Sequence, residues 1–584
     1  MYCRAIACDF DGTTAINGQL APEVAAALAT ARVQGYVTLL VSGRLLEDLR
    51  ALTPDLSMFD AVVAENGAVI HLPYADRIIQ LGVPPPNEFL GELRAHGVPF
   101  HVGNVVVGTW DRHTAAVLEL VRRSGVDCQP IFNREALMLL PSGVNKAFGT
   151  CRALEELERS ARNLIAFGDA ENDLPLLSMA EVGVAARGAV PVLAAHADDH
   201  LTQAGGAGVA HYIHRLLEAH GTVPTPPRHQ LVLGTTAEGT PAALPASGTN
   251  VMISGDPRSG KSWLTGLVAE QLLDRGYLLC ILDPEGDHLS LGQRRHVLVL
   301  GADLALPDPS AVPRVLRSQG VSIVLNLAPL SVQAQTAYVN AVLHELESCC
   351  AQIGLPNWIV IDEAQYFFHE TSALARRFAG TVNFLFATHR PSLVSDVVYA
   401  GVQAHVITRT AIDDERYFIT SLLQARGTQD VVVADALMMI DMGHAGLLIE
   451  DAVTPRWQIF TPAGRVTSHT HHARKYADTR LPDDKAFRFL CTNGSQPIVA
   501  HTVVEFHLAL KTVNIASLHH HMTRGDFSRW IREVLGNLRF AAEILKLERT
   551  TQAGATPNRE ELLAAVEEHY LLGGRGAESV DSQP

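Results

Sequence analysis

Two aspartates near the start of the chain have the types and the spacing that phosphoryl transfer needs. The run CRAIACDFDGTT places Asp9 and Asp11 directly after a short apolar stretch, which we expect to be a buried strand. In a parallel sheet, ligands usually bind beyond the carboxyl ends of the strands. There Asp9 can attack phosphorus and Asp11 can protonate the leaving oxygen, while Gly12 and Thr13 let the backbone approach a phosphate. Taken alone, the pattern also fits a turn capped by acidic side chains.

Three later segments supply the groups that would complete such a site. Ser42 and Gly43 in LLVSGR follow another apolar run and offer a hydroxyl and backbone amides. Lys146 in PSGVNKAFG supplies a cation, and FGDAENDLPLL supplies Asp169 and Asp173. A single lysine at this point would offset charge where a metal ion and a phosphate meet.

These four clusters, taken in this order, resemble the haloacid dehalogenase superfamily of phosphohydrolases over about residues 1–215. The resemblance implies that Asp9 forms an aspartyl-phosphate, that Asp11 is the general acid and base, and that the cofactor is Mg²⁺, which prefers hard oxygen ligands. It assigns Thr13, Ser42, Gly43, Lys146 and Asn172 to the substrate phosphate, and Asp9, Asp11, Asp169 and Asp173 to the metal. Of these, Asp173 would act through water or as a partner of a ligand.

The segments GDAENDLPLL and AENGAVI (64–70) look most like the Cof-type subgroup, which includes phosphoglycolate and sugar-phosphate phosphatases. The subgroup implies an α/β cap at about 83–141 that selects the substrate, and a role for Asn66 near the phosphate. Possible cap contacts are His101, Asn104, Trp110 and Arg112, although each is better explained as an ordinary surface or packing residue. One departure is visible, since Ala185 and Ala186 stand where relatives often carry Asn.

A second phosphate site is predicted by NVMISGDPRSGKSWLTGLVAEQLL. Here the pattern GxxxxGKS lies between an apolar strand and an amphipathic helix, which is the context that a phosphate-binding loop requires. Its residues are Gly255, Asp256, Pro257, Arg258, Ser259, Gly260, Lys261 and Ser262. The loop amides would cradle the phosphates of ATP, Lys261 would contact the terminal phosphates, and Ser262 would bind Mg²⁺.

Two carboxylates further along the chain favour hydrolysis of that nucleotide. In WIVIDEAQYFF, Asp362 and Glu363 follow an apolar strand. Asp362 would hold Mg²⁺ through water, and Glu363 would polarise the attacking water. Because kinases usually lack the second carboxylate, the pair predicts an ATPase.

Two more segments, YLLCILDPEGDHLSLG (277–292) and FLFATHRPSLV (384–394), resemble the HerA/FtsK branch of ring-forming ATPases. The resemblance implies acidic residues near the nucleotide at Asp283 and Glu285. It also implies a γ-phosphate sensor in the second segment, where the pair Thr388-His389 replaces a frequent Gln.

The same analogy implies a homo-oligomeric ring, and this prediction rests on the family analogy alone. Within such a ring, Arg390 and Arg409 could stabilise charge across a subunit boundary. A surface ion pair explains each of these arginines equally well.

The chain organisation predicts three domains in 584 residues. Apolar runs alternate with helical stretches on both sides of a Pro-rich segment near residue 220, which is typical of parallel α/β sheets. We therefore expect two doubly wound α/β domains, a phosphatase at 1–220 and a P-loop ATPase at 221–465, followed by a mainly helical domain at 466–584.

Composition excludes several classes of protein. A hydrophobic share of 47% suits folded domains, and a net charge of −16 disfavours a DNA-coating role. The eight cysteines form no CxxC pair, which argues against a zinc ribbon or a disulfide framework and favours a reducing cytoplasm. The sequence contains no signal peptide and no apolar run long enough to span a membrane, so we expect no membrane partner.

The C-terminal part contains two groups of histidines, His469, His471 and His472, and His519, His520 and His521. They could bind a metal, but polar helix-end or interface positions fit better, because no Cys or carboxylate recurs at zinc-site spacing. The region resembles an uncharacterised helical domain found attached to other enzymes. Arg524, Arg529, Arg532 and Trp530 could touch nucleic acid, although a solvated amphipathic helix is the simpler explanation.

The favoured hypothesis is a Cof-type Mg²⁺-dependent phosphatase for a small phosphorylated metabolite, joined in one chain to a domain that binds and hydrolyses ATP. An alternative is a translocase-like ATPase on nucleic acid whose phosphatase processes nucleic-acid ends. The acidic balance, the Asp-Glu pair and the cap weigh against it. In a third hypothesis, ATP binding only regulates the phosphatase.

Overall fold

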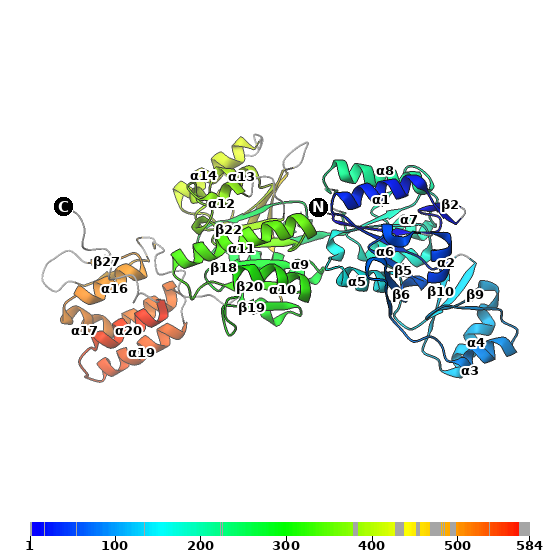
Figure 1. Cartoon of the computed structure of the whole chain (residues 1–584). Coiled ribbons are helices and arrows are strands. Elements are labelled where there is room, and N and C mark those ends of the chain that lie inside the picture. Colours follow the sequence, from blue (N-terminus) through cyan, green and yellow to red (C-terminus); the bar gives the residue numbers. More distant parts are fainter. Residues whose placement is uncertain are drawn as a thin grey trace. The chain divides into compact units, whose positions relative to one another are not determined.

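A computed structural model of the chain describes all residues except 1–2, 17, 54, 134, 222, 225, 378–382, 427–436, 451–455, 468–480, 482, 484, 491–497, 536–537 and 571–584. Figure 1 follows the chain from blue to red. Internal contacts divide the chain into two units, Met1–Pro284 with Leu291–Thr467, and Glu285–Ser290 with Ser468–Pro584. Each unit is described by itself.

The first sheet has eight strands in the order β14-β13-β12-β1-β4-β5-β6-β7. They are β1 (Ala5–Asp9), β4 (Val37–Val41), β5 (Ala61–Ala64), β6 (Val69–Leu72), β7 (Arg77–Gln80), β12 (Leu164–Gly168), β13 (Val182–Ala185) and β14 (Asp199–His200). Strands β14 to β5 pair in parallel, and β6 and β7 are antiparallel. Every residue of β1 is buried, as expected for an unbroken apolar run inside a parallel sheet.

Helices cover both faces of this sheet (Figure 1). They are α1 (Pro22–Val33), α2 (Leu46–Leu52) and α8 (Gly205–Glu218) on one face, and α5 (Lys146–Glu156), α6 (Leu174–Met179) and α7 (Pro191–His196) on the other. Successive residues of β1 supply the two cores, with Ile6 and Cys8 on the first face and Ala5 and Ala7 on the second. In such a three-layer arrangement, ligands usually bind beyond the carboxyl ends of the strands.

A smaller α/β layer is inserted between β7 and α5. Its antiparallel sheet has the order β10-β11-β9-β8 and carries two helices on its own apolar core. The elements are α3 (Asn87–Ala95), β8 (His101–Val102), β9 (Val107–Trp110), α4 (Thr114–Ser124), β10 (Gln129–Asn133) and β11 (Ala136–Leu140). We call this layer the cap. A two-stranded ribbon, β2 (Ala15–Ile16) with β3 (Gln19–Leu20), follows β1.

The second large sheet has eleven strands in the order β16-β15-β25-β24-β23-β17-β22-β21-β18-β20-β19. They are β15 (Gln230–Thr236), β16 (Pro241–Pro245), β17 (Val251–Ser254), β18 (Leu279–Asp283), β19 (Val297–Leu300), β20 (Ser322–Asn326), β21 (Trp358–Ile361), β22 (Phe384–Thr388), β23 (Ala404–Thr408), β24 (Ala445–Ile449) and β25 (Arg456–Pro462). Strands β23 to β19 are parallel.

Strands β24, β25, β15 and β16 extend this sheet in antiparallel fashion. The expectation of a purely parallel sheet was therefore incomplete, because hairpin-connected strands from both ends of this region add to its edge. The helices are α9 (Lys261–Asp274), α10 (Val312–Gln319), α11 (Val332–Ile353), α12 (Ala373–Arg377), α13 (Asp396–Ala400) and α14 (Asp413–Ala425). Residues of α9 belong to one core of the sheet, and residues of α10 and α11 belong to the other.

The C-terminal unit is largely helical, as its Leu, Ala and Glu periodicity predicts. Its elements are β26 (Phe487–Phe489), β27 (Ile498–Ala500), α16 (Val503–Thr512), α17 (Ile515–Arg524), α18 (Asp526–Trp530), α19 (Leu538–Gln552) and α20 (Arg559–Tyr570). An aromatic cluster fills its core, formed by Phe487, Phe489, Phe506, Phe527 and Trp530.

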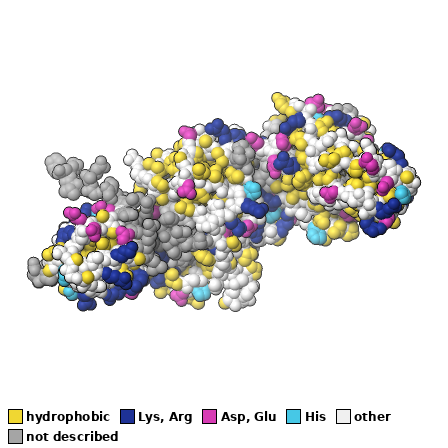
Figure 2. Space-filling model, turned by 90° about the horizontal axis from the view of Figure 1, so that it is seen from below, with side chains coloured by type: hydrophobic (Ala, Val, Ile, Leu, Met, Phe, Trp, Pro, Cys, Tyr) yellow, Lys and Arg dark blue, Asp and Glu magenta, His cyan; other side chains and the backbone are white. Residues whose placement is uncertain are grey.

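Figure 2 shows one face of the molecule, on which Lys and Arg side chains lie among Asp and Glu side chains. Among the helices that the structure describes, none has both the length and the apolar character needed to cross a membrane. The seven cysteines in the described part of the chain are unpaired thiols.

Candidate active site

Three buried carboxylates meet at the carboxyl ends of two adjacent strands of the first sheet. Asp9 is the last residue of β1, Asp169 follows β12, and Asp173 ends the short 3-10 turn that comes next. One carboxylate oxygen from each residue lies within 4.8 Å of the others. Parallel pairing of β1 with β12 therefore brings Asp9 close to two carboxylates that lie far along the chain from it.

Lys146 joins two of these carboxylates. The side chain of Asn145 accepts a hydrogen bond from the Phe148 amide and so caps α5, which makes Lys146 the first helical residue. Lys146 Nζ donates to Asp9 Oδ1 and to Asp173 Oδ1, each at 2.6 Å. Lys146 therefore links Asp9, the candidate nucleophile, to Asp173 of the segment FGDAENDLPLL.

The charges in this group shift one another. Burial alone would lower the pKa of Lys146, but Asp173 and Asp9 more than compensate and raise it above its ordinary value. The pKa of Asp9 is raised by burial and by the charge of Asp173, and Lys146 opposes this shift. Lys146 thus opposes the protonation of Asp9 that burial and the charge of Asp173 favour.

The group fits a divalent metal ion. Asp9 Oδ2 is buried and has no hydrogen-bond partner in the described structure. Three carboxylates beside one ammonium leave excess negative charge, which a cation would offset. All of the available atoms are carboxylate oxygens, the donors that Mg²⁺ prefers. The residues therefore suit the Mg²⁺ that the sequence predicts.

Asp11 lies apart from the three carboxylates. Both of its oxygens accept hydrogen bonds from Arg44, one from Nε and one from Nη2, each at 2.7 Å. The pKa of Arg44 is raised, chiefly by this hydrogen bonding. The sequence reasoning did not identify Arg44, although it directly follows Ser42 and Gly43 in the phosphate segment. A metal contact through Asp11 stays a prediction, because this ion pair already occupies its carboxylate.

Asp173 has both of its oxygens engaged. Oδ1 accepts from Lys146, and Oδ2 accepts from the backbone amides of Asp169 and Ala170 at 3.0 and 3.1 Å. A side chain held in this way positions its neighbours. Of the two roles predicted for Asp173, that of a partner of a metal ligand therefore suits it better than that of a ligand through water. Asn172, in the same turn, donates to Asn66 Oδ1 at 2.9 Å and leaves its own Oδ1 without a hydrogen-bond partner.

The residues expected to hold the substrate phosphate line the same strand ends. Ser42 follows β4 and is buried, and its hydroxyl accepts a hydrogen bond from the Arg44 amide at 3.1 Å. Thr13 is buried and its hydroxyl lacks a hydrogen-bond partner. A methyl group placed on Gly43 would lie 3.6 Å from Met138 and 3.7 Å from Asn133 Nδ2. Strands β10 and β11 of the cap therefore pass directly over the predicted phosphate site.

The suggested cap contacts are mainly packing residues. The guanidinium of Arg112 lies 5.0 Å from the centre of the Trp110 ring, and His101 meets the same ring edge-on at 6.0 Å. Asn104 hydrogen-bonds to Glu65 in the core. Ala185 ends β13 and is buried, as is Ala186, so neither position supplies an amide side chain to the phosphate region.

The second predicted site also lies at strand ends. The segment from Gly255 to Gly260 connects β17 to α9, and Lys261 Nζ donates to the backbone oxygen of Asp256 at 2.7 Å. Gly255 has φ +147°, and a Cβ there would lie 2.0 Å from Thr408 Oγ1. Both Lys261 and Ser262 are buried at the start of the helix. The loop is thus a compact turn that a larger residue at Gly255 would disrupt.

Glu363 lies in a polar group that the sequence revealed only in part. Its carboxylate is fully buried, accepts from Gln365 Nε2 at 2.8 Å and pairs with His389 Nδ1 at 2.5 Å. Thr388 in turn donates to Gln365 Oε1 at 2.6 Å. Strand β22, which ends at Thr388, lies between β17 and β21. Gln365 was missed, although it stands in the same DEAQ run as Asp362 and Glu363.

The remaining predicted residues of this site are more dispersed. Asp283 is buried at the end of β18, whereas Glu285 falls in the second unit. Arg390 Nη1 lies 3.7 Å from Glu415 Oε1, which agrees with the ion-pair alternative. Arg409 is exposed, and its backbone oxygen accepts from the Asp256 amide at 3.0 Å.

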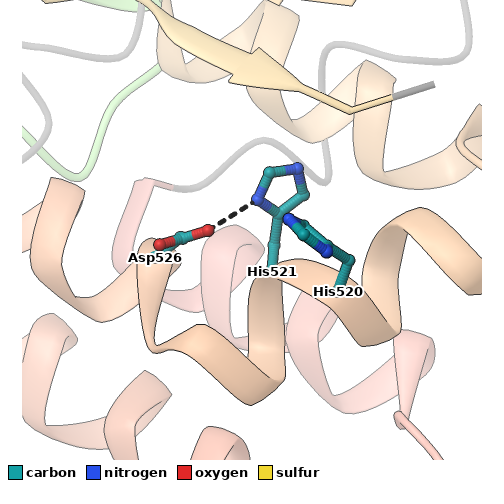
Figure 3. A group of neighbouring side chains, drawn as sticks. All are labelled: His520, His521 and Asp526. Atoms are coloured by element: carbon teal, nitrogen blue, oxygen red, sulfur yellow. Dashed lines mark hydrogen bonds and ion pairs between the residues drawn. The ribbon is translucent and has the colours of Figure 1, made fainter. Parts of the chain in front are cut away.

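Figure 3 shows the second cluster of possible metal ligands in the described structure, His520, His521 and Asp526. His521 is already saturated, because its Nδ1 lies 2.9 Å from Asp526 Oδ2 and its Nε2 accepts from the Leu490 amide at 3.0 Å. Burial lowers the pKa of His521, and the contact with Asp526 opposes this shift. This agrees with the structural explanation of the histidines. His469, His471 and His472 lie outside the described residues.

Comparison with known proteins bears on the N-terminal part. The family of haloacid dehalogenase-like hydrolases matches residues 6–85 and 131–213. A phosphoglycolate phosphatase of Methanothermobacter thermautotrophicus is 31% identical over 223 residues, which cover 37% of this chain and 99% of that protein. A phosphoglycolate phosphatase of Aeropyrum pernix is 28% identical over 194 residues, covering 30% and 78%. A haloacid dehalogenase-like hydrolase structure from Bacteroides thetaiotaomicron aligns with TM-score 0.33 and 20% identity, covering 37% and 99%.

The carboxylates of this open α/β sheet lie at the strand ends, where ligands usually bind in such folds. Through its N-terminal part, the chain belongs to the haloacid dehalogenase-like hydrolases.

Proposed function

We propose that the N-terminal domain hydrolyses phosphate monoesters through an aspartyl-phosphate on Asp9. One observation carries this proposal: Lys146 holds one oxygen of a buried Asp9, while the other oxygen has no hydrogen-bond partner. A carboxylate fixed on one side and open on the other is suited to nucleophilic attack.

Asp9, Asp11 and one water molecule account for the bond changes and proton transfers of the reaction. Asp9 attacks phosphorus, the ester bond to the leaving oxygen breaks, and Asp11 gives that oxygen a proton. Asp11 then takes a proton from water, the water oxygen attacks phosphorus, and the bond to Asp9 breaks to release inorganic phosphate. Arg44 donates to both oxygens of Asp11, so this pairing must open and Asp11 must take up a proton from solvent before its first acid step.

Asp9 and Asp169 would hold Mg²⁺, with Asp173 acting behind them through water or through Lys146. When bound, the ion would supply charge stabilisation to the phosphoryl oxygens. Ser42, Thr13 and Lys146 would bind the same oxygens from the protein side.

The proposed substrate is a small phosphorylated metabolite, with phosphoglycolate as the first choice. Two relatives carry the name phosphoglycolate phosphatase, and one of them is matched over nearly its whole length. The position of the cap over Gly43 supports a small substrate, because Met138 and Asn133 leave limited room above the phosphate site. Unpaired thiols in the described structure are consistent with a reducing cytoplasm.

For the second domain we propose binding and hydrolysis of ATP. The supporting observation is that Lys261 and Ser262 begin a helix after a glycine-rich turn, in the same sheet as the buried pair Asp362 and Glu363. His389 and Gln365 hold Glu363, the residue that would activate water. A homo-oligomeric ring remains an analogy with the HerA/FtsK branch.

Action on nucleic acid is the second candidate, in which the phosphatase would process phosphorylated ends. It is less favoured, because the chain carries a net charge of −16 and both signs of charge lie among one another on the face in Figure 2.

The deciding experiment is Mg²⁺-dependent phosphate release by Lys261→Ala protein, in which the ATPase is silenced. The panel contains phosphoglycolate, sugar phosphates, nucleotides and oligonucleotides with 3′ or 5′ phosphates. Selective turnover of a small metabolite supports the proposal, selective turnover of oligonucleotide ends supports the alternative, and no turnover at all contradicts both.

A further inference from the structure

A buried glutamate beside the active site reaches out of the core and into the cap. Glu65 begins the turn that follows β5, is 0% exposed, and has a left-handed backbone with φ 52°. A side chain is rarely placed in that conformation, and a carboxylate is rarely buried without several partners. Both features indicate that this carboxylate has a specific task.

The hydrogen-bond partners of the Glu65 carboxylate all belong to the cap loop of residues 103–106, which joins β8 to β9. Glu65 Oε1 accepts from the backbone amide of Asn104 at 2.8 Å and from its side-chain amide at 3.0 Å. Oε2 accepts from the amides of Val105 at 2.8 Å and Val106 at 3.0 Å. One carboxylate thus satisfies three consecutive backbone amides of the cap, and such bonds to a charged acceptor are strong.

Packing places the same loop against the core. Val105 and Val106 are buried in the apolar cluster of the large sheet, whereas the next residue, Val107, belongs to the core of the cap. Gly103 has no room for a side chain, because a Cβ there would lie 2.6 Å from Glu65 Oε2. The loop is therefore one of the points at which the cap packs against the hydrolase core, beside Met138 and Leu140 of β11.

The other side of the turn contacts the phosphate site. The Glu65 amide donates to the Arg44 backbone oxygen at 2.9 Å, and the Asn66 amide donates to the Ser42 backbone oxygen at 3.0 Å. Asn66 Oδ1 accepts from Asn172 at 2.9 Å. The turn thus joins two phosphate-binding segments on one side to the cap loop on the other.

We propose that Glu65 is a latch, a positioning residue that holds the cap in its substrate-binding position over the phosphate site. The proposal rests on the phosphatase function proposed above. Glu65 does not reach the reacting atoms, so loss of the latch lowers the fraction of molecules whose cap is in place. Apparent affinity falls in proportion to that fraction, while turnover of the bound complex is largely kept.

The test uses the full-length Glu65→Gln protein, which keeps the size of the side chain but turns an NH₂ group toward amide donors. Hydrogen–deuterium exchange reports the backbone amides of residues 104–106, and we expect them to exchange at least about tenfold faster than in wild type. With p-nitrophenyl phosphate, we expect KM to rise about tenfold and kcat to change less than about threefold. Glu88→Gln, an exposed glutamate on α3, serves as the matched control and should alter neither value.

Other outcomes would overturn the latch. If the substitution only unfolded part of the protein, fewer molecules would be active, so kcat would fall and KM would stay unchanged. That result would contradict the proposal. Unchanged exchange at residues 104–106 likewise contradicts the proposal. If Glu65→Gln does not fold, Asn104→Ala removes one bond from the cap side, and we expect a smaller KM increase in the same direction. Wild-type protein without any Mg²⁺-dependent phosphatase activity would defeat the proposed function, and the exchange data would then decide the latch alone.

Discussion

The two predicted phosphate sites of this chain both lie at the carboxyl ends of strands, but different chemical groups surround their key residues. In the N-terminal domain, side-chain charges form the site, with Lys146 between Asp9 and Asp173. In the second domain, Lys261 contacts a backbone oxygen of its own loop, and Glu363 is held by Gln365 and His389 instead of a lysine.

The proposed functions would account for this difference by the origin of the nucleophile. A carboxylate that itself attacks phosphorus must stay ionised while buried, and a fixed ammonium beside it favours the ionised form. A carboxylate that activates water must accept a proton, and a permanent cation in contact with it would oppose that step. The two sites should therefore respond independently to mutation.

The largest expected effect is that of Asp9→Asn. Phosphatase activity should fall by about 10⁴-fold or more, because an amide cannot form the acyl-phosphate. ATP hydrolysis should continue at the wild-type rate. Phosphate release from a monoester and from ATP, measured on the same preparation, checks both statements, and Asp76→Asn at a side chain that is 90% exposed is the control.

The converse variant is Lys261→Ala. Removing the ammonium from the loop should reduce ATP hydrolysis by about 10³-fold, since one preorganised charge at a phosphate is lost. The phosphatase should be unaffected, as in the control Arg295→Ala at an exposed position of the same domain. If either Asp9→Asn or Lys261→Ala abolished both activities in folded protein, the two sites could not be independent.

A smaller effect is expected for His389→Ala, which tests the partner of the water-activating carboxylate. ATP hydrolysis should fall by about tenfold to a hundredfold because Glu363 loses its orientation. The dissociation constant for ATP should change little, since His389 pairs with Glu363. Equilibrium nucleotide binding measured beside steady-state hydrolysis separates the two quantities, with the exposed His369→Ala as control. Loss of binding would place His389 at the nucleotide instead.

The smallest effect concerns acid stability, where the second domain contains a buried neutral histidine. Burial lowers the pKa of His405 to about 3. Protonation of His405 therefore favours the unfolded chain. The stability that comes from keeping this histidine neutral is complete above pH 6.5 and is lost as the pH falls from 6.5 toward 3. At pH 5 the free energy of unfolding has fallen by about 2 kcal/mol through this group. His405→Phe should therefore lose less Tm between pH 7.5 and pH 5 than wild type.

The exposed His444→Gln serves as the control for that measurement and should keep the wild-type pH dependence. An identical fall of Tm in His405→Phe and wild type would show that other groups dominate acid unfolding.

The outlines of the first site could be predicted from sequence because its residues lie at strand ends. Apolar runs identify the strands, and parallel strands bring their carboxyl ends to one edge. Asp9, Asp169 and Asp173 therefore had to converge once their strands paired. Arg44 and Glu65 were missed, since their partners lie 33 to 41 positions away and their pairing depends on how loops cross.

One other expectation was incomplete for a related reason. Antiparallel strands at the edge of the second sheet come from both ends of its sequence, and a local apolar pattern does not say which strands become neighbours. For the histidine triplet, metal binding was the less favoured alternative, and a backbone amide and Asp526 occupy His521. Whether a polar side chain is available to bind a ligand depends on the neighbours that it meets only in the folded chain.

The sequence by itself determined which residue types stand at the ends of the strands, and with them the acidic cluster at the first sheet and the glycine-rich turn before Lys261. The tertiary structure decided that Lys146 bridges Asp9 to Asp173, that Arg44 occupies Asp11, and that Glu65 joins the cap to the core. The reason is physical. Strand ends follow from local hydrophobic patterns, whereas partners of a buried charge are chosen by the three-dimensional packing that removes water from it.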